Sequence, residues 1–81
     1  MSMYETMMHI LYAKQDNGGT IETDRNMRMD YSGTINDLIN MGIIVRVTVK
    51  SDPRYLKFTE LGLKKINYMR EVRGLSTEHS T

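Results

Sequence analysis

The residues best suited to chemistry are four cationic side chains in one stretch of alternating polar and apolar residues. They are Arg46, Lys50, Arg54 and Lys57. Exposed cations on a hairpin bind phosphate groups, which adds affinity without selecting a base sequence. We therefore predict that these four side chains contact phosphates. The competing interpretation is that they are the ordinary solvated charges of a strand.

A helix with one polar face is predicted just before these cations. Apolar side chains recur at helical spacing between residues 30 and 41. The apolar stripe consists of Tyr31, Ile35, Leu38 and Ile39. The opposite face is polar and consists of Ser32, Gly33, Asn36, Asp37 and Asn40.

This polar face has groups that suit duplex DNA. Ser32 can donate a hydrogen bond to a phosphate, Gly33 permits close approach, and the Asn36 amide offers the paired donor and acceptor that suits adenine. Arg28, just before the helix, is placed to reach a phosphate or a guanine. Alternatively the face is only polar surface, because Asp37 repels phosphate and the helix itself has no Arg or Lys.

The groups that catalysis or metal binding would need do not form a set. His9 falls on the polar side of a predicted first helix and His79 near the C-terminus, so the sequence indicates no His–carboxylate or His–Cys pairing for catalysis or zinc. The Gly18-Gly19 pair predicts a turn, because the lysine-containing phosphate-loop pattern is missing. We expect no enzymatic activity, no catalytic residue, no metal and no cofactor.

Length and composition indicate one small domain without disulfide bonds or a cysteine-based metal site. The chain has 81 residues and no cysteine, so packing, and a second subunit if one is present, must stabilise it. No apolar run approaches the roughly 20 residues of a membrane span, and no signal peptide is evident. We expect a cytoplasmic protein that has no contact with a membrane and no evident small-molecule ligand.

The charge is distributed unevenly along the chain. Residues 1–40 carry three basic and six acidic side chains, whereas residues 41–81 carry eight basic and four acidic ones. The second half is therefore the electropositive part, as a surface that contacts a nucleic-acid backbone requires. Ordinary solvated surfaces also produce such an asymmetry.

Local signals predict the remaining elements. Gly42 ends the helix at 30–41 in a left-handed conformation, and Thr59 caps a last helix. Val45, Val47 and Val49 alternate with polar residues as in a half-buried strand. The predicted order begins with a helix at 3–15, a turn at 16–19 and a short strand at 20–21. A short helix follows, which Thr23 caps and Met27 and Met29 anchor, and then comes the helix at 30–41. The chain continues with a hairpin at 43–58 that turns at 51–53 and points Leu56 and Phe58 inward, a helix from Glu60 to about Arg73, and a disordered tail at 74–81.

The first and last helices have apolar arcs too wide for one small core. Their surplus residues are Tyr4, Met8, Tyr12, Tyr68, Met69 and Val72. We interpret them as the interface of a homodimer. The alternative is that neighbours within the same monomer clamp the first helix.

The run LINMGIIVRVTVKSDPRYLKFTELG resembles the helix–wing–helix segment of winged-helix transcription regulators of the MarR and PadR type. It is also similar to the minimal winged-helix proteins of archaeal viruses, phages and plasmids. The resemblance spans about residues 3–73 and implies an α+β winged helix-turn-helix, usually homodimeric, that binds duplex DNA. The stretch 22–29 departs from the family pattern, which has a small residue and a glycine-containing turn there.

Together these features predict a sequence-specific regulator of transcription. The helix at about 30–41 would lie in the major groove and the hairpin at 43–58 on the DNA backbone. A dimer would place two such helices in successive major grooves of a pseudo-palindromic site. The alternative is a winged-helix module that docks on a polymerase or other host machinery without binding DNA, which the net charge of +1 and Asp37 favour.

Overall fold

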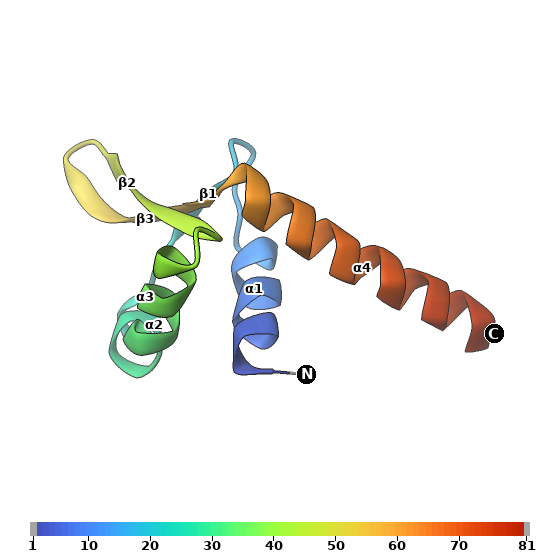
Figure 1. Cartoon of the computed structure of the whole chain (residues 1–81). Coiled ribbons are helices and arrows are strands. Elements are labelled where there is room, and N and C mark those ends of the chain that lie inside the picture. Colours follow the sequence, from blue (N-terminus) through green and yellow to red (C-terminus); the bar gives the residue numbers. More distant parts are fainter. Residues whose placement is uncertain (1, 81) are drawn as a thin grey trace.

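The computed structural model describes residues 2–80, and the side chains of residues 2–72. It shows a small α+β domain with four helices and a three-stranded antiparallel sheet in the order β1-β3-β2 (Figure 1). The predicted α+β class and order of elements are confirmed. The elements are α1 (Met3–Ala13), β1 (Thr20–Glu22), α2 (Arg25–Asp30), α3 (Ser32–Asn40), β2 (Ile44–Val49), β3 (Asp52–Phe58) and α4 (Glu60–Ser80).

Helix α3 ends as the sequence predicted, at a glycine in the left-handed region. Gly42 has φ +77°, and its N–H donates to the Ile39 carbonyl at 3.0 Å. The next N–H, of Ile43, donates to the Leu38 carbonyl at 3.0 Å. This pair of bonds is the Schellman motif, which satisfies carbonyls that a helix end leaves free. The chain thereby turns sharply from α3 into β2.

Helix α4 begins against this same turn. The Thr59 N–H and hydroxyl donate to the Ile43 carbonyl at 3.0 and 3.1 Å, and the hydroxyl also lies against the Gly42 carbonyl. The same hydroxyl accepts the Gly62 N–H at 3.0 Å, so the predicted Thr59 cap is confirmed. Gly62 allows the approach, because a Cβ there would lie 2.0 Å from the Ile43 carbonyl oxygen.

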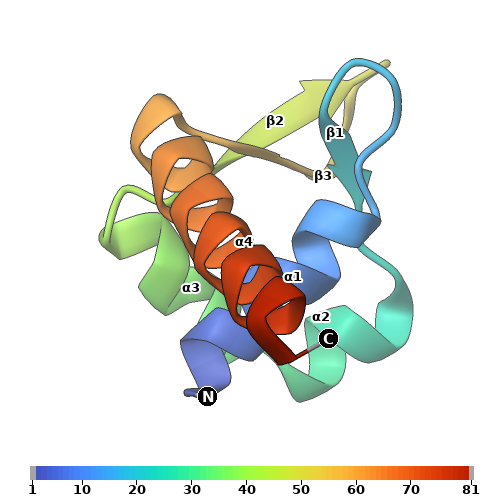
Figure 2. The ribbon, with the colours of Figure 1, turned by 90° about the vertical axis from the view of Figure 1, so that its right-hand side faces the viewer.

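The core lies where α1, α3 and α4 meet one face of the sheet. Helix α1 lies between α3 and α4 in Figure 1, and α4 crosses in front of α1 in Figure 2. Met8 is 5% exposed, so a residue assigned to the dimer interface is also part of the monomer's core. The buried apolar residues are Met7, Met8, Leu11, Ile21, Met27, Ile35, Leu38, Ile43, Ile44, Leu56, Phe58 and Ile66.

The predicted short strand pairs as a third member of the sheet. β1 runs antiparallel to β3, with Ile21 opposite Leu56, and both side chains are fully buried. β1 is far from the hairpin in sequence, so this pairing joins two distant parts of the chain in one sheet. It also brings the start of α2 close to β3.

Three predictions about α2 and the start of α3 are wrong. Asp24, not Thr23, caps α2, because its carboxylate accepts the Met27 N–H at 2.7 Å. Thr23 is instead buried and donates its hydroxyl to the Arg54 carbonyl at 2.6 Å. Met27 is buried as predicted, but Met29 is 66% exposed. Tyr31, predicted to face inward, is 40% exposed.

The hairpin turns earlier than the sequence predicted. Lys50 and Ser51 have φ +50° and +67°, and Val49 pairs with Asp52 across them. Positive φ at both central residues marks the two-residue turn that matches the twist of a hairpin. Asp52 and Pro53 therefore belong to β3 and not to the turn.

A bulge makes room for Pro53 within the central strand. Just beyond the turn, β3 has two residues, Pro53 and Arg54, where β2 has only Thr48. Proline has no N–H to donate, so it is tolerated in a sheet where the ladder is interrupted. The bulge also leaves the Arg54 carbonyl in place to accept from Thr23.

The faces of β2 are the reverse of the prediction. Arg46 lies opposite the buried Leu56, so it shares the inner face of the sheet, with Ile44. Val45 lies opposite Lys57 and is 42% exposed on the outer face. The inward orientation predicted for Leu56 and Phe58 is confirmed, whereas Val45 does not meet the core, and Val47 and Val49 are half-buried.

Helix α4 continues to Ser80, past the predicted end near Arg73. Its C-terminal part extends away from the rest of the domain (Figure 1). The longest dimension of the molecule, with α4 included, is 46 Å. The predicted disordered tail, 74–81, lies outside the residues whose side chains are described.

We expect Gly62→Ala to destabilise the domain by about 3 kcal/mol, because the new Cβ must displace the backbone of Ile43. Urea unfolding measures the change. Gly33→Ala is the matched control: nothing lies within 4 Å of its Cβ position, and alanine favours a helix, so stability should rise by up to about 1 kcal/mol. Equal stabilities for the two variants would contradict the role assigned to Gly62.

Candidate nucleic-acid interface

The start of α3 is set by an abrupt junction with α2. A single residue, Tyr31, lies between the two helices as the C-cap of α2 and the N-cap of α3, with φ −126° and ψ 18°. No side chain caps α3. The glycine-containing turn that the resemblance implied between these helices is therefore not present. Ser32, the first residue of α3, follows directly on α2 and lies on the side of β2.

Three of the predicted DNA-binding residues line one small pocket. Arg28 from α2, Ser32 from α3 and Arg46 from β2 enclose about 130 Å³, together with Thr23 and Ile35. The Arg28 guanidinium donates to the Thr23 carbonyl and, at 3.4 Å, to its hydroxyl. Thr23 is in turn fixed by β3. The two arginines are 18 residues apart in sequence and meet here only because β2 lies against α3.

The polar face of α3 begins beside this pocket. The Asn36 Oδ1 atom accepts a hydrogen bond from Arg46 Nη2 at 3.1 Å. Gly33 is exposed, with open space where its Cβ would lie. The structure therefore brings together Arg28, Ser32 and Arg46, with Asn36 bound to Arg46.

Asp37, whose negative charge disfavours contact with phosphate, has a hydrogen-bond partner on α1. Its carboxylate accepts the Tyr4 hydroxyl at 2.9 Å, and this hydrogen bond raises the pKa of Tyr4. Asn36 is bonded instead to β2. The carboxylate thus points toward α1, while the amide one residue earlier points toward the hairpin. The acidic group does not line the arginine pocket.

The other predicted phosphate contacts lie farther out along the hairpin. Lys50 is exposed at the turn. Arg54 is already paired: its Nε donates to both carboxylate oxygens of Asp52, at 2.8 and 2.9 Å. Lys57 lies on the outer face of the sheet, opposite Thr20, and so away from the face that carries Arg46. Lys50 is the hairpin cation best placed beyond the pocket.

The Asp52–Arg54 pair perturbs both groups. Hydrogen bonds from the Arg54 side chain and backbone N–H lower the pKa of Asp52 to about 2, and the pKa of Arg54 is raised. A phosphate contact by Arg54 would have to compete with this carboxylate. Residues two apart in a strand point to the same face, so the spacing of Asp52 and Arg54 within β3 already permits this pair.

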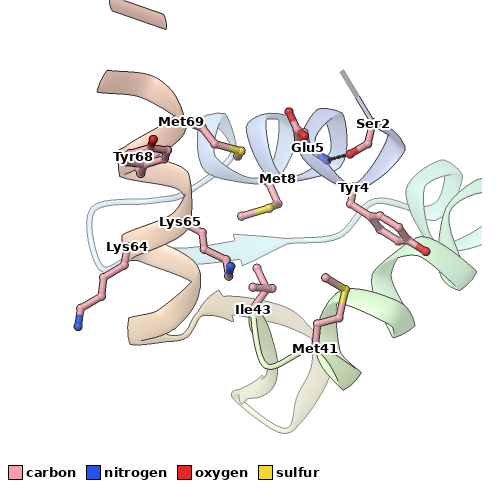
Figure 3. A pocket seen from close by; sticks show the side chains of 10 residues that line it. All are labelled: Ser2, Tyr4, Glu5, Met8, Met41, Ile43, Lys64, Lys65, Tyr68 and Met69. Carbon is pink, nitrogen blue, oxygen red and sulfur yellow. Dashed lines mark hydrogen bonds between the residues drawn. The ribbon is translucent and has the colours of Figure 1, made fainter. Parts of the chain in front are cut away.

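A second, larger groove of about 460 Å³ lies between α1 and α4 (Figure 3). Four of the six predicted dimer residues line it: Tyr4, Met8, Tyr68 and Met69. Sequence reasoning did not find the contributions of Met41, Ile43, Lys64 and Lys65. Met41 and Ile43 reach the groove from the turn after α3. They line it because α4 packs on that turn, a contact that the sequence does not indicate.

The remaining two predicted dimer residues lie elsewhere. Tyr12 packs against the core with the centre of its ring 6.3 Å from that of Phe58, and the Arg70 guanidinium lies over the Tyr12 ring, 4.4 Å from its centre. Val72 is 44% exposed on α4. Tyr12 therefore fixes α1 against α4 within the monomer.

In the part of the chain that the structure describes, no three His, Cys, Asp or Glu side chains come together as a metal ion would require. Over the same residues, no helix combines the length and the apolar character needed to cross a bilayer.

Comparisons with protein-family models, with characterised proteins and with solved structures gave no match to this chain. The resemblance to winged-helix regulators therefore stays a prediction, and the functional argument depends on the arrangement of the side chains.

The Asp52–Arg54 pair generates a pH prediction. The pKa of Asp52 is lowered on folding, so its stabilising contribution is present above about pH 4 and is lost as the pH falls through about 2. We expect Asp52→Asn to be less stable than the parent at pH 7 and equally stable at pH 2, as measured by urea unfolding. Asp30→Asn controls for the loss of one charge. A stability difference between Asp52→Asn and the parent that stays constant from pH 7 to 2 would contradict the assignment.

Proposed function

We propose that this protein is a winged-helix DNA-binding regulator in which α3 enters the major groove and the β2–β3 hairpin contacts the backbone. The observation that carries the proposal is the position of Arg28, Ser32 and Arg46 around one pocket beside the open face of α3. These groups come from three separate elements. Polar side chains that contribute only to solubility would not need to converge on one pocket.

The face of α3 offers base-reading groups with little steric obstruction. Gly33 leaves open space, and Asn36 is exposed one turn into the helix. An asparagine amide pairs with the N6 and N7 atoms of adenine in the major groove. Since α3 carries no cation, the affinity comes mainly from the arginines beside it and from Lys50 at the hairpin turn.

The orientation of Asp37 removes the main objection to DNA binding. Its carboxylate is directed to Tyr4 on α1. A groove surface that includes Arg28, Asn36 and Arg46 therefore excludes this charge. The repulsion between Asp37 and a phosphate beside the arginines is correspondingly reduced, because the carboxylate accepts from Tyr4 and does not line the pocket.

Gly33→Glu tests this face directly. A Cβ at this position meets no atom within 4 Å, and glutamate favours a helix more than glycine does, so the domain should be at least as stable as the parent. A carboxylate against the DNA should lower the affinity for duplex about tenfold or more. The measurement is a titration of labelled genomic fragments at low and at moderate salt, with parental binding weakening as salt rises.

Thr6→Glu is the control, because it adds the same charge in the first turn of a different helix, on an exposed part of α1. It should bind DNA about as well as the parent. Absence of duplex binding by the parent at low salt would refute the proposed function, and equal losses in both variants would remove α3 from the interface.

The second element of the proposal is a homodimer formed through α1 and α4. Tyr68 is 67% exposed at the edge of the groove, and Tyr4 is 39% exposed on the facing helix. Helix α4 also extends beyond the body of the domain (Figure 1). Helices are stabilised mainly by packing of an apolar face. The α4 helix of a second copy, placed in the groove, would cover these residues.

Sedimentation tests the dimer with Tyr68→Glu and Asn67→Glu, which introduce the same charge on neighbouring exposed positions of α4. The parent and Asn67→Glu should sediment as dimers at micromolar concentration, and Tyr68→Glu as a monomer. A monomeric parent at high micromolar concentration would refute the dimer. In that case the groove suits an apolar helix of another protein, as in the alternative of a protein-interaction module.

A further inference from the structure

We propose that the pocket between α2, α3 and β2 is a seat for one phosphate oxyanion, and that a backbone phosphate occupies it when the protein is on DNA. The identity of the phosphate as DNA rests on the proposed function; the chemistry of the seat does not. The pocket encloses about 130 Å³. Since a water molecule takes about 30 Å³ of the liquid, an ion of several heavy atoms fits.

The pocket has an excess of positive charge. Its lining consists of Thr23, Arg28, Ser32, Ile35 and Arg46, which include two arginines and no acidic residue. Like charges that converge in a partly enclosed space repel one another unless an anion lies between them. The free protein therefore holds two cations in an arrangement that an oxyanion would relieve.

The carboxylates that act on Arg28 have other partners. Asp24 accepts the Met27 N–H at 2.7 Å, which lowers its pKa, and forms an ion pair with Lys14 at 3.4 Å. Asp52 is held by Arg54. Neither carboxylate lines the pocket. An anion from outside is therefore the counter-charge that the site lacks.

The donors are held in place and still have capacity. Arg28 uses Nη1 on Thr23, and Arg46 uses Nη2 on Asn36. A guanidinium has five N–H groups, so each arginine keeps donors for an oxyanion. Ser32 adds a hydroxyl at the first position of α3, where the helix dipole also favours negative charge. The phosphate would thus be bound from three sides.

This seat would link backbone binding to base reading. Arg46 is bonded to Asn36, so a phosphate held by Arg46 lies at a fixed position relative to the amide that faces adenine. A phosphate contact fixes the register of a protein on the duplex. The seat would therefore determine which base pair Asn36 meets.

The test uses Ser32→Asp, which places a carboxylate between the two arginines, with Ser32→Asn as the uncharged control. Inorganic phosphate should raise the thermal midpoint of the parent more than chloride does at equal ionic strength. Ser32→Asp should be more stable than the parent in chloride, by about 4 °C, should lose the response to phosphate, and should bind duplex at least tenfold more weakly. Ser32→Asn should keep the phosphate response.

The outcomes separate the seat from the proposed function. If phosphate and chloride act alike on the parent, and Ser32→Asp gains no stability over Ser32→Asn, the seat is refuted, whatever DNA does. If the phosphate response is present and is lost in Ser32→Asp, but the parent binds no duplex, the seat holds for free phosphate and the DNA proposal fails. If duplex binding is the same in both variants, the backbone phosphate is refuted as the occupant.

Discussion

The carbonyl group of Ile43 is the point on which the rest of the structure depends. It accepts hydrogen bonds from the Thr59 backbone and hydroxyl, and it lies where Gly62 has no side chain. Through it the end of α3, the start of β2 and the start of α4 are fixed to one another. If this contact were longer by the size of a methyl group, α4 would move off the core, and both the groove along α1 and the position of β2 against α3 would change.

Sequence reasoning succeeded where a residue type has one structural use. A glycine after an apolar helical stripe ends the helix, and a threonine before Glu-Leu-Gly caps the next one, so Gly42 and Thr59 were assigned correctly. The same holds for the third strand, because a β-branched pair after a glycine turn has few alternatives. These signals are local, and local signals were enough for the order of elements.

The errors occurred where a pattern allows two solutions. Alternation in β2 permits either set of residues to face the core, and shifting the strand by one residue exchanges the sets. Ile44 and not Val45 meets the core, so Arg46 follows onto the inner face. There it lies beyond the edge of the core, beside α3, where an inward-facing cation can still reach solvent. Arg54 likewise allows two interpretations from its spacing, because the side chain can serve a ligand or pair with Asp52 two residues earlier, and in the structure it pairs with Asp52.

The reversal in β2 changes the functional argument more than it changes the fold. With Arg46 on the outer face, the hairpin would have carried a row of independent cations, and α3 a separate polar face without charge. With Arg46 on the inner face, an arginine from the sheet reaches the helix and binds Asn36 directly. The arginine charge and the polar face of α3, which are separate in the sequence, then belong to one surface. The affinity expected of the hairpin is thereby divided: Lys50 stays at the turn, Arg54 is paired with Asp52, and Arg46 acts with Arg28 at the start of α3.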